Sequence, residues 1–396
     1  DALNLLESGQ AYRDFSTLEE AEEDKKADME AGTRLRGARK RADSRSGEEE
    51  EALLAAGRPF AVRFRVPEGE TRWVDGVHGE MRFQNQDIDD LVILRSDGTP
   101  TYNLAVVSDD VEMGITLVLR GDDHLSNTPK QVLLYEALGK PVPDFAHVPM
   151  ILGSDGKRLS KRHGATAVGE YARQGILPEA MFNFLALLGW SPGDDREVLT
   201  RDELVEAFSI KRILKKSSVF DPEKLEWLNG QHLMRTATEI LVVDLENRLK
   251  AQGVSQELPQ GAEPLDLHLL VDLLKPRSRT MDELVTQAIP YMRAQVEYDP
   301  VAVRKQWEKD PEAVVERLRR MEALLNETDW SPDRLEERTR ALAEDLGLGL
   351  GKILQPLRVA LTGTSASPGM FDVLVLLGRK RSLGRIRAAL DHLEGR

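Results

Sequence analysis

The sequence predicts an α/β region followed by an all-α region. Three observations lead to this prediction. A strand, a helix and a second strand follow one another between Ile115 and Leu152, at the spacing of a βαβ unit with parallel strands. Strand patterns end after Ala165. Beyond about residue 236, helices punctuated by Pro and Gly continue to the C-terminus without a fixed repeat period.

The first 60 residues or so are expected to be helical and highly charged. Ser16 and Glu19 form a predicted capping box ahead of the segment LEEAEEDKKADMEAG. A basic block, RLRGARKR from Arg34 to Arg41, precedes an acidic run. We interpret this block as a solvated helix face or a mobile hairpin, and an RNA contact stays open as the alternative.

Strands are expected from Phe60 to Leu94, because FAVRFRV alternates apolar with basic residues and TRWVDGVHGEMRF carries turn glycines. The next segment, DLVILRSDGTPTYNLAVV, gives two apolar runs around a Ser-Asp-Gly turn. We therefore predict that one strand ends near TYNLAVV.

The βαβ unit begins with ITLVLRG, whose β-branched content is typical of a buried strand. The helix that follows has Asn127 or Thr128 as its predicted N-cap, Pro129 at its first position and Gly139 at its end. The segment FAHVPMIL is the second predicted strand and leads directly into the loop GSDGKRLSKRHG.

Helix signals follow this loop. Pro178 is expected to begin the helix PEAMFNFLALLGW, and Thr200 with Glu203 forms a second predicted capping box. Asp221 and Pro222 are expected to begin the next helix.

Composition limits the functional classes. The chain has 396 residues, enough for two or three domains, and a formal net charge of -14, which argues against indiscriminate coating of nucleic acid. Cysteine is absent, so disulfides and thiolate metal sites are excluded. The seven His residues show no ligand spacing, and we expect no metal site and no zinc.

Neither a membrane span nor a signal peptide is expected. The apolar runs are shorter than the roughly 18 residues that a bilayer crossing needs. The N-terminus lacks a basic region and a cleavage site. The chain does not begin with Met, and we expect it to begin partway through a longer protein.

Open α/β sheets bind ligands at the carboxyl ends of their parallel strands. Strands ending near TYNLAVV, at Arg120 and at the loop Gly153–Gly164 would bring ten polar side chains to one edge. These are Tyr102, Arg120, Asp122, Asp123, His124, Lys157, Arg158, Ser160, Lys161 and Arg162.

The loop is strongly basic, with four cations among the six residues from Lys157 to Arg162. Ammonium groups beside a Ser hydroxyl and backbone N–H groups suit a polyphosphate, and such groups stabilise the charge that develops in phosphoryl or nucleotidyl transfer. A solvated basic turn is the alternative. The position of the loop at a strand end favours the polyphosphate site.

Arg120 follows a predicted buried strand and therefore needs an anionic partner. Asp122 or Asp123 could supply it, and a substrate carboxylate, which suits the guanidinium fork, is the alternative. Both interpretations stay open on the residues alone. Tyr102 by itself predicts a packed aromatic, and His124 a structural residue.

Four segments follow one another in the order and spacing of bacterial glutamyl-tRNA synthetases: PTYNLAVVSDD, LRGDDHLSNTPKQVLLYEALG, GKRLSKRHG and LPEAMFNFLALLGWSPGDD. The chain resembles this family of class I aminoacyl-tRNA synthetases most strongly from Asp89 to Leu233. The resemblance implies ATP-dependent activation of L-glutamate, with Mg²⁺ entering on ATP, and transfer of glutamate to the terminal adenosine of tRNA-Glu.

The resemblance also implies site residues. The segment Arg158–Arg162 is similar to the family's KMSKS-type loop, which holds ATP phosphates, and Arg158, Ser160 and Lys161 take its catalytic positions. The implied ATP-binding residues are Ile151, Arg158, Leu159, Ser160, Lys161 and Arg162. The implied glutamate-binding residues are Tyr102, Asn103, Leu104, Ala105, Val106, Arg120 and Asp123, with Arg120 on the side-chain carboxylate.

Two basic segments are expected to contact tRNA by the same resemblance, one at the inner stem and one in an anticodon-reading domain. Solvated helix faces are the alternative for both. The implied contacts are Lys211, Arg212, Lys215, Lys216, Arg379, Arg381 and Arg385.

The resemblance divides the chain into four parts. They are a partial acceptor-stem insertion (1–88), the second half of a Rossmann-like nucleotide-binding domain (89–164), a helical stem-contact region (165–235) and a helical anticodon-binding domain (236–396). We expect a monomeric cytoplasmic protein without membrane contact.

Three departures accompany the resemblance. The family's HIGH-type motif is absent, so the first half of the nucleotide-binding domain is expected upstream of Asp1. Strands within 89–152 would then lose their neighbours, and we expect this chain to aggregate and to bind ATP poorly. Arg158 replaces the loop's first lysine, and the zinc site that some members build from Cys is missing. A non-catalytic tRNA-binding protein is the alternative function.

Overall fold

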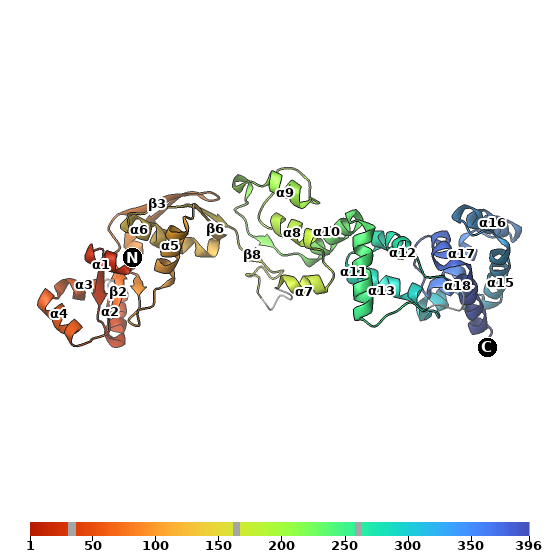
Figure 1. The fold of residues 1–396 in the computed structure, drawn as a ribbon, viewed down its shortest axis with the longest axis horizontal. Helices are drawn as coiled ribbons and strands as arrows, with labels where there is room; N and C mark the ends of the chain where they lie inside the picture. Colours follow the sequence, from red (N-terminus) through yellow and green to blue (C-terminus); the bar gives the residue numbers. More distant parts are fainter. Residues whose placement is uncertain (31–36, 161–166, 258–262, 396) are drawn as a thin grey trace. The chain divides into compact units, whose positions relative to one another are not determined.

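The computed structural model describes residues 1–30, 37–160, 167–257 and 263–395 (Figure 1). The chain forms two compact units. The first contains Asp1–Leu159, Ala186–Arg196 and Asp202–Phe220, and the second contains Ser160–Leu185, Glu197–Arg201 and Asp221–Arg396.

A three-stranded antiparallel sheet begins the first unit, in the order β1-β2-β5. It consists of β1 (Ala11–Asp14), β2 (Ala61–Phe64) and β5 (Val92–Leu94). The helices of this region are α1 (Ala2–Glu7), α2 (Leu18–Glu30), α3 (Gly37–Ser44) and α4 (Gly47–Ala55). Strand β1 corrects the expectation of a wholly helical N-terminus: Ala11 and Tyr12 are buried, and Arg63 of β2 contacts Asp14 at 2.5 Å.

The capping box of α2 lies one residue later than predicted. The Glu20 carboxylate accepts the Thr17 N–H at 2.7 Å, and the Thr17 hydroxyl accepts the Glu20 N–H at 3.2 Å. The Ser16 hydroxyl instead contacts Asp14.

Two arginines of the predicted basic block bind carboxylates inside the first unit. Arg39 contacts the buried Asp90, and Arg41 contacts Asp24, so both are engaged within the fold. Residues 34–36 of the block lie outside the described residues.

The second sheet carries the predicted βαβ unit. Its order is β4-β3-β7-β6, with β3 (Glu70–Asp75), β4 (Gly79–Gln84), β6 (Leu117–Gly121) and β7 (Asp144–Val148). Strand β7 runs parallel to both β3 and β6, and helix α6 (Thr128–Ala137) connects β6 to β7. The expected loss of neighbours is therefore wrong for β7, because the hairpin β3–β4 supplies one.

Residues Tyr102–Met113 form helix α5, so the prediction of a strand near TYNLAVV was wrong. Leu104 and Val107, three residues apart, are its buried positions, and Gly114 ends it with φ +66°. Short apolar runs cannot be assigned to helix or strand by periodicity alone, and the tertiary core decides here. Figure 1 shows α5 and α6 beside the sheet, where their apolar faces join a core that includes Phe64, Trp73 and Phe145.

The predicted strand FAHVPMIL is two separate strands. Its first part is β7, and its second part is β8 (Ile151–Leu152), which pairs in parallel with β9 (Ser218–Val219). Strand β9 also corrects the prediction that strands end after Ala165.

Most of the remaining elements are helices, and two of the predicted helix starts are confirmed. Pro178 begins α8, and Asp221 caps α10 by accepting the N–H groups of Glu223 and Lys224. The capping box of Thr200 and Glu203 stays a prediction. The helices are α7 (Val168–Arg173), α8 (Pro178–Leu187), α9 (Arg201–Ala207), α10 (Pro222–Arg235), α11 (Thr238–Ala251), α12 (Leu267–Leu274), α13 (Met281–Met292), α14 (Pro300–Gln306), α15 (Pro311–Glu327), α16 (Pro332–Asp345), α17 (Gly351–Thr362) and α18 (Met370–Leu393).

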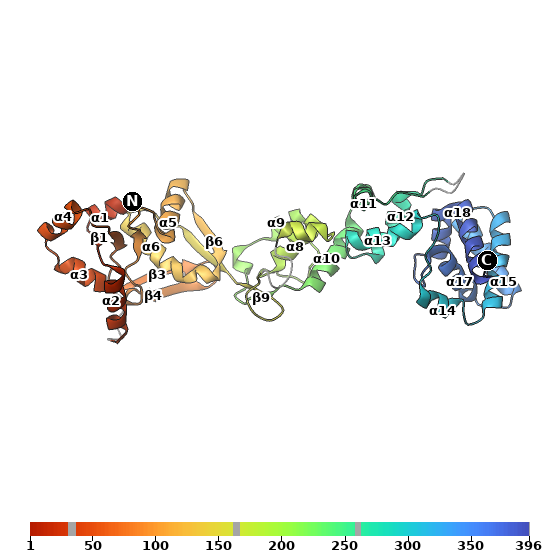
Figure 2. The same cartoon turned by 90° about the horizontal axis from the view of Figure 1, so that it is seen from below.

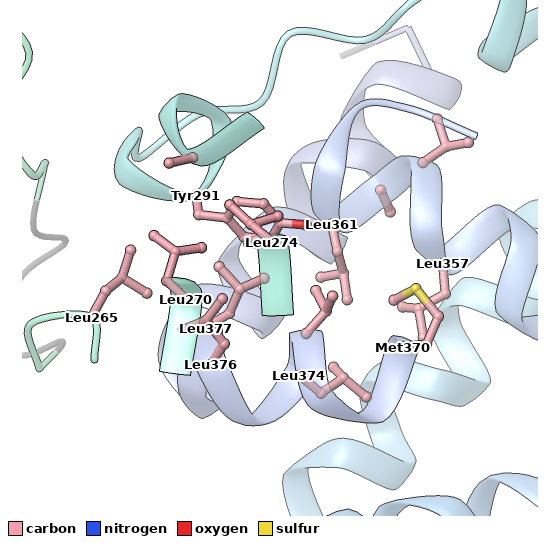
Figure 3. Close-up of a cluster of buried hydrophobic side chains, with 14 of the residues drawn as sticks. Leu265, Leu270, Leu274, Tyr291, Leu357, Leu361, Met370, Leu374, Leu376 and Leu377 are labelled. Carbon is pink, nitrogen blue, oxygen red and sulfur yellow. The ribbon is translucent and has the colours of Figure 1, made fainter. Parts of the chain in front are cut away.

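The second unit is built around one apolar core. Figure 3 shows part of it, where Leu270 and Leu274 of α12 meet Leu361 of α17 and Leu377 of α18. Figures 1 and 2 show α15, α17 and α18 side by side. Gly378 interrupts α18 with φ +72° and ψ +167°, a backbone conformation that favours glycine.

Candidate active site and RNA-contact residues

Arg120 lies at the carboxyl end of β6, beside His147 on the parallel strand β7. Its Nη2 donates to the Thr128 hydroxyl at 2.8 Å and to Gln131 Oε1 at 2.9 Å. Its Nε donates to His147 Nε2 at 3.3 Å. The guanidinium carbon also lies 5.7 Å from the centre of the Phe145 ring. The side chain is thus held in one orientation by helix α6 and strand β7.

Neither Asp122 nor Asp123 pairs with Arg120, and within the described part of the chain Arg120 makes no ion pair with any carboxylate. Three of its five N–H groups are used by His147, Thr128 and Gln131. The two N–H groups of Nη1 have no acceptor among the described residues. Of the two partners that the sequence left open, the neighbouring aspartates are therefore ruled out.

The network continues to helix α5. Gln131 donates from Nε2 to Asn103 Oδ1 at 3.2 Å and accepts from Arg120 through Oε1, so Gln131 connects Asn103 to Arg120. Gln131 and Thr128 are buried, although both are polar. The sequence did not identify Thr128, Gln131 or His147, because their roles depend on the pairing of β6 with β7 and on the packing of α6.

The predicted pocket residues on α5 do not share one surface. Tyr102 is exposed, and its ring centre lies 6.0 Å from that of His124. Leu104 is buried in the hydrophobic core. Successive helix residues are rotated by about 100°, so the side chains of Asn103–Val106 point in different directions, and their place in one pocket stays a prediction.

The basic loop begins as a hairpin. Leu159 N–H donates to Ile151 O at 2.9 Å, and Gly156 turns the chain with φ +73°. Arg158 binds Asp123 through Nη2 and Oδ2 at 3.0 Å, so a predicted ATP residue meets a predicted pocket residue. Lys161 and Arg162 lie outside the described residues.

The basic residues between 211 and 216 are all exposed. Lys215 donates to the His78 carbonyl at 3.3 Å, and Arg212 donates to the Pro192 carbonyl at 2.5 Å. Lys211 lines a surface cavity together with Arg212. The exposed ammonium groups of this segment leave it suited to an anionic partner.

The arginines near the C-terminus are mostly structural. Arg385 is 2% exposed and donates to the carbonyls of Leu361, Pro290, Tyr291 and Arg293. Burial, with Arg381 nearby, lowers its pKa to about 10. Arg381 is 3% exposed. Their burial contradicts both the expected tRNA contact and its alternative, a solvated helix face, for Arg381 and Arg385. Arg379 is exposed and donates to the carbonyls of Asn326 and Thr328 at the C-terminal end of α15.

The second unit contains a cavity of about 600 Å³ that the sequence did not indicate. Arg277, Gln287, Thr364 and Ser367 contribute polar groups to its wall, and Tyr291 contributes an aromatic ring. Arg358 donates to the carbonyl of Ser367 at 3.0 Å and so fixes one wall.

Two further observations concern the described residues only. They contain no group of three or more side chains placed to hold a metal ion. They also contain no helix with the length and apolar character needed to cross a bilayer.

Family models match both parts of the chain. The catalytic domain of class I tRNA synthetases (E and Q) matches residues 2–227, and an anticodon binding domain matches residues 233–390.

Curated relatives match over nearly the whole chain. The glutamate–tRNA ligase of Syntrophotalea carbinolica is 43% identical over 98% of this chain and 80% of the relative. The glutamate–tRNA ligase of Thermodesulfovibrio yellowstonii is 44% identical over 98% of this chain and 82% of the relative. The chain thus spans about four fifths of the length of both.

Solved structures agree with these matches. A glutamate tRNA ligase from Elizabethkingia meningosepticum, crystallised in complex with its amino acid, has a TM-score of 0.87 and 30% identity, covering 99% of this chain and 81% of that one. A glutamate–tRNA synthetase from Elizabethkingia anophelis has a TM-score of 0.84 and 29% identity, covering 98% of this chain and 81% of that one. The chain belongs to the glutamate–tRNA ligases, a family of class I aminoacyl-tRNA synthetases.

Proposed function

We propose that this protein activates L-glutamate with ATP and transfers the glutamyl group to the 3′-terminal adenosine of tRNA-Glu. The α-carboxylate of glutamate attacks the α-phosphate of ATP, which releases pyrophosphate and forms glutamyl-adenylate. The terminal hydroxyl of the tRNA then attacks the glutamyl carbonyl and releases AMP. Mg²⁺ enters with ATP as part of the substrate. We place the protein in the cytoplasm, because tRNA is charged there for translation.

The observation that carries the proposal is the state of Arg120. A guanidinium held by three neutral acceptors keeps its full charge, and Nη1 still has two N–H groups to donate. A carboxylate is the natural partner of such a group, because charge-assisted hydrogen bonds to it are strong and directional. Arg120 would bind the side-chain carboxylate of glutamate, and Tyr102 would stand at the edge of the same pocket.

The loop after β8 would bind ATP. Lys157 and Arg158 precede Ser160, and cationic groups at this position neutralise phosphate charge as it develops. The ion pair of Arg158 with Asp123 is mostly solvent-exposed on the arginine side, so phosphate could compete for the guanidinium at little cost. Lys161 would supply a second cation by its position in the family's loop motif.

The basic segment Lys211–Lys216 would contact the tRNA stem, and the cavity lined by Arg277 and Thr364 would receive a nucleotide of the anticodon loop. Arginine and amide donors beside an aromatic ring suit an unstacked base, which single-stranded RNA offers. Arg379 stays a proposed phosphate contact, because its side chain is exposed.

Charging of purified tRNA tests the proposal. The intact gene product, ATP–Mg²⁺ and labelled L-glutamate should yield tRNA-Glu carrying an alkali-labile glutamyl ester. L-glutamine in place of glutamate should yield none, because a neutral amide cannot replace the carboxylate at Arg120. Adding tRNA-Gln in a parallel reaction shows whether that tRNA is also glutamylated.

A protein that binds tRNA-Glu but forms no ester with glutamate would contradict the proposal. That outcome would favour a tRNA-binding protein without catalytic activity.

A further inference from the structure

A buried pair, Asp75 and His147, lies directly behind Arg120. Both side chains are fully shielded from solvent, and Asp75 Oδ2 lies 2.5 Å from His147 Nδ1. Nε2 on the other side of the imidazole faces Arg120 Nε at 3.3 Å and the Thr128 hydroxyl at 3.0 Å. Three strands contribute to this arrangement, because Asp75 ends β3, His147 lies in β7 and Arg120 in β6.

The contacts determine where His147 carries its proton. The Nε of an arginine can only donate, so His147 Nε2 must present a lone pair. The proton of the neutral ring is then on Nδ1 and is donated to Asp75. Burial lowers the pKa of His147 and outweighs Asp75, which acts to raise it, so the ring stays neutral.

Asp75 is also held in place by several hydrogen bonds. Its Oδ1 accepts the backbone N–H groups of Val77 at 3.0 Å, His78 at 3.0 Å and His147 at 3.2 Å. Burial alone would raise the pKa of Asp75, but the hydrogen bonds from His147, His78 and Val77 outweigh burial and lower it. The carboxylate therefore stays ionised, with Oδ2 left for the imidazole.

We propose that Asp75 and His147 are positioning residues for glutamate recognition: they fix the Nδ1–H tautomer, and the Nε2 lone pair aims the guanidinium of Arg120 so that Nη1 faces the substrate carboxylate. This inference rests on the proposed function. Neither residue touches substrate. The pair acts through Arg120. It leaves the charge of the guanidinium intact, because His147 Nε2 and the Thr128 hydroxyl, which accept from Arg120, are both neutral.

A purely structural role, in which the pair only joins β3 to β7, predicts different behaviour. Loss of the pair would then lower stability without changing the affinity for glutamate relative to ATP. The two roles are separable because Asp75 uses different oxygens for the backbone and for His147.

Asp75→Asn tests the proposal most directly. Asparagine keeps one oxygen for the three backbone N–H groups, but it presents N–H to His147 Nδ1 where the aspartate accepted a proton. The ring must then carry its proton on Nε2, facing the Nε–H of Arg120. Two donors would oppose each other, and the guanidinium would turn away from its position.

¹⁵N NMR of histidine-labelled protein reports the tautomer. We expect the Nδ1–H form of His147 in the unaltered protein and the Nε2–H form, or a mixture, in Asp75→Asn. His232 is an internal reference for the opposite tautomer, because its Nε2 lies 3.0 Å from Asn183 Oδ1, which also accepts the Leu199 N–H. His147→Gln assigns the resonances by removing one pair.

Kinetics of ATP–pyrophosphate exchange by the intact gene product report the consequence. Asp75→Asn should raise the KM for glutamate roughly five- to tenfold and leave the KM for ATP within about twofold. His147→Gln retains an oxygen acceptor for Arg120 and should restore most of the affinity that His147→Leu loses. His268→Gln, a change at an exposed histidine of the second unit, should alter neither KM.

Three results would overturn the inference while leaving the ligase proposal standing. They are an Nε2–H tautomer in the unaltered protein, an Asp75→Asn protein with a switched tautomer and an unchanged glutamate KM, and equal KM values for His147→Gln and His147→Leu. A wild-type protein that forms no glutamyl ester would instead overturn the proposed function, and with it the substrate assigned to Arg120.

Discussion

Arg385 is buried and Arg120 is half-buried. Neither guanidinium has an ion-pair partner among the described residues. They differ in what the two terminal nitrogens of the guanidinium bind. Arg385 donates from Nη1 and Nη2 to four backbone carbonyls in α17 and in and beside α13, and so joins both helices to α18, although its buried Nε has no acceptor among the described residues. Arg120 has three acceptors and an unused Nη1. The first pattern indicates a structural residue, and the second leaves donors for the substrate carboxylate proposed above.

Arg385→Met should therefore destabilise the second unit by about 2 kcal/mol, because four buried carbonyls lose a donor while the methionine fills the space. Arg385→Lys keeps the charge but loses the planar fork, and it should destabilise by about half as much. Urea unfolding followed by far-UV circular dichroism measures both changes.

An RNA-contact role for Arg385 predicts the reverse. Arg385→Met would then keep the unfolding midpoint of the unaltered protein and lose affinity for tRNA. Equal midpoints would contradict the structural assignment.

The arginines also differ in how much of their role could be predicted from the sequence. Arg120 could be predicted to need an anionic partner, because a guanidinium lies there at a buried strand end, but the residues alone left the neighbouring aspartates and a substrate carboxylate both open. Arg381 and Arg385 could not be separated from Arg379 in the run GRKRSLGRIR. Their exposure depends on the helix face that packs on α13 and α17, and the kink at Gly378 sets that face.

At the scale of elements, helix α10 is joined to two loops by Asn229. Its Oδ1 accepts the Leu177 N–H at 2.7 Å, and its Nδ2 donates to the carbonyls of Gly175 at 3.2 Å and Arg279 at 2.6 Å. Asn229 is completely buried. The Gly175 carbonyl also accepts the Met281 N–H at 3.0 Å, so two backbone groups, the Leu177 N–H and the Arg279 carbonyl, depend on this one amide among the described residues.

Asn229→Ala should destabilise the second unit by about 2–4 kcal/mol, since each buried group left without a partner costs roughly 1–3 kcal/mol. Asn247→Ala is the matched control, because Asn247 lies exposed on the neighbouring helix α11 and should change stability by less than about 0.5 kcal/mol. Thermal unfolding by calorimetry compares the variants. A similar small effect for both would refute the assigned role of Asn229.

Elements that depend on local sequence signals could be predicted well. Elements that depend on contacts between distant residues could not. The start of α6 could be predicted to within one residue, because a proline in the first turn is a local signal: the helix begins at Thr128 after Asn127, and Pro129 is its second residue. Helix α5 was mistaken for a strand, because its apolar run suits either element and the choice depends on the core that Leu104 enters. The parallel pairing of β3 with β7 was not predictable, since nothing local links Asp75 to Phe145.

At the scale of the molecule, the prediction of an α/β region followed by helices is confirmed, and so is the resemblance to glutamate–tRNA ligases. Four motifs in a fixed order carried that resemblance. The division into four domains stays a prediction. The network behind Arg120 lay beyond sequence analysis, because it joins residues from β3, β6, α6 and β7 that only the folded sheet brings together.

A phosphate-contact role for Lys211, Lys215 and Lys216 predicts salt-dependent binding of tRNA. Replacing all three by Gln should reduce the slope of log K against log salt by about 2 to 3, since each contact contributes roughly 0.7–0.9. Lys140→Gln is the control, because this exposed lysine lies outside the predicted contacts and should leave the slope unchanged. Fluorescence titration at several salt concentrations measures the slope. A triple variant with the wild-type slope would refute the contact.

The central claim is that Arg120 recognises the side-chain carboxylate of glutamate. Glutamate-dependent ATP–pyrophosphate exchange in the presence of tRNA, measured for the intact gene product and for Arg120→Gln, tests it most directly. We predict exchange by the unaltered protein and a roughly ten- to hundredfold higher KM for glutamate in the variant, with the KM for ATP nearly unchanged. An Arg120→Gln protein with the wild-type KM for glutamate would contradict the claim.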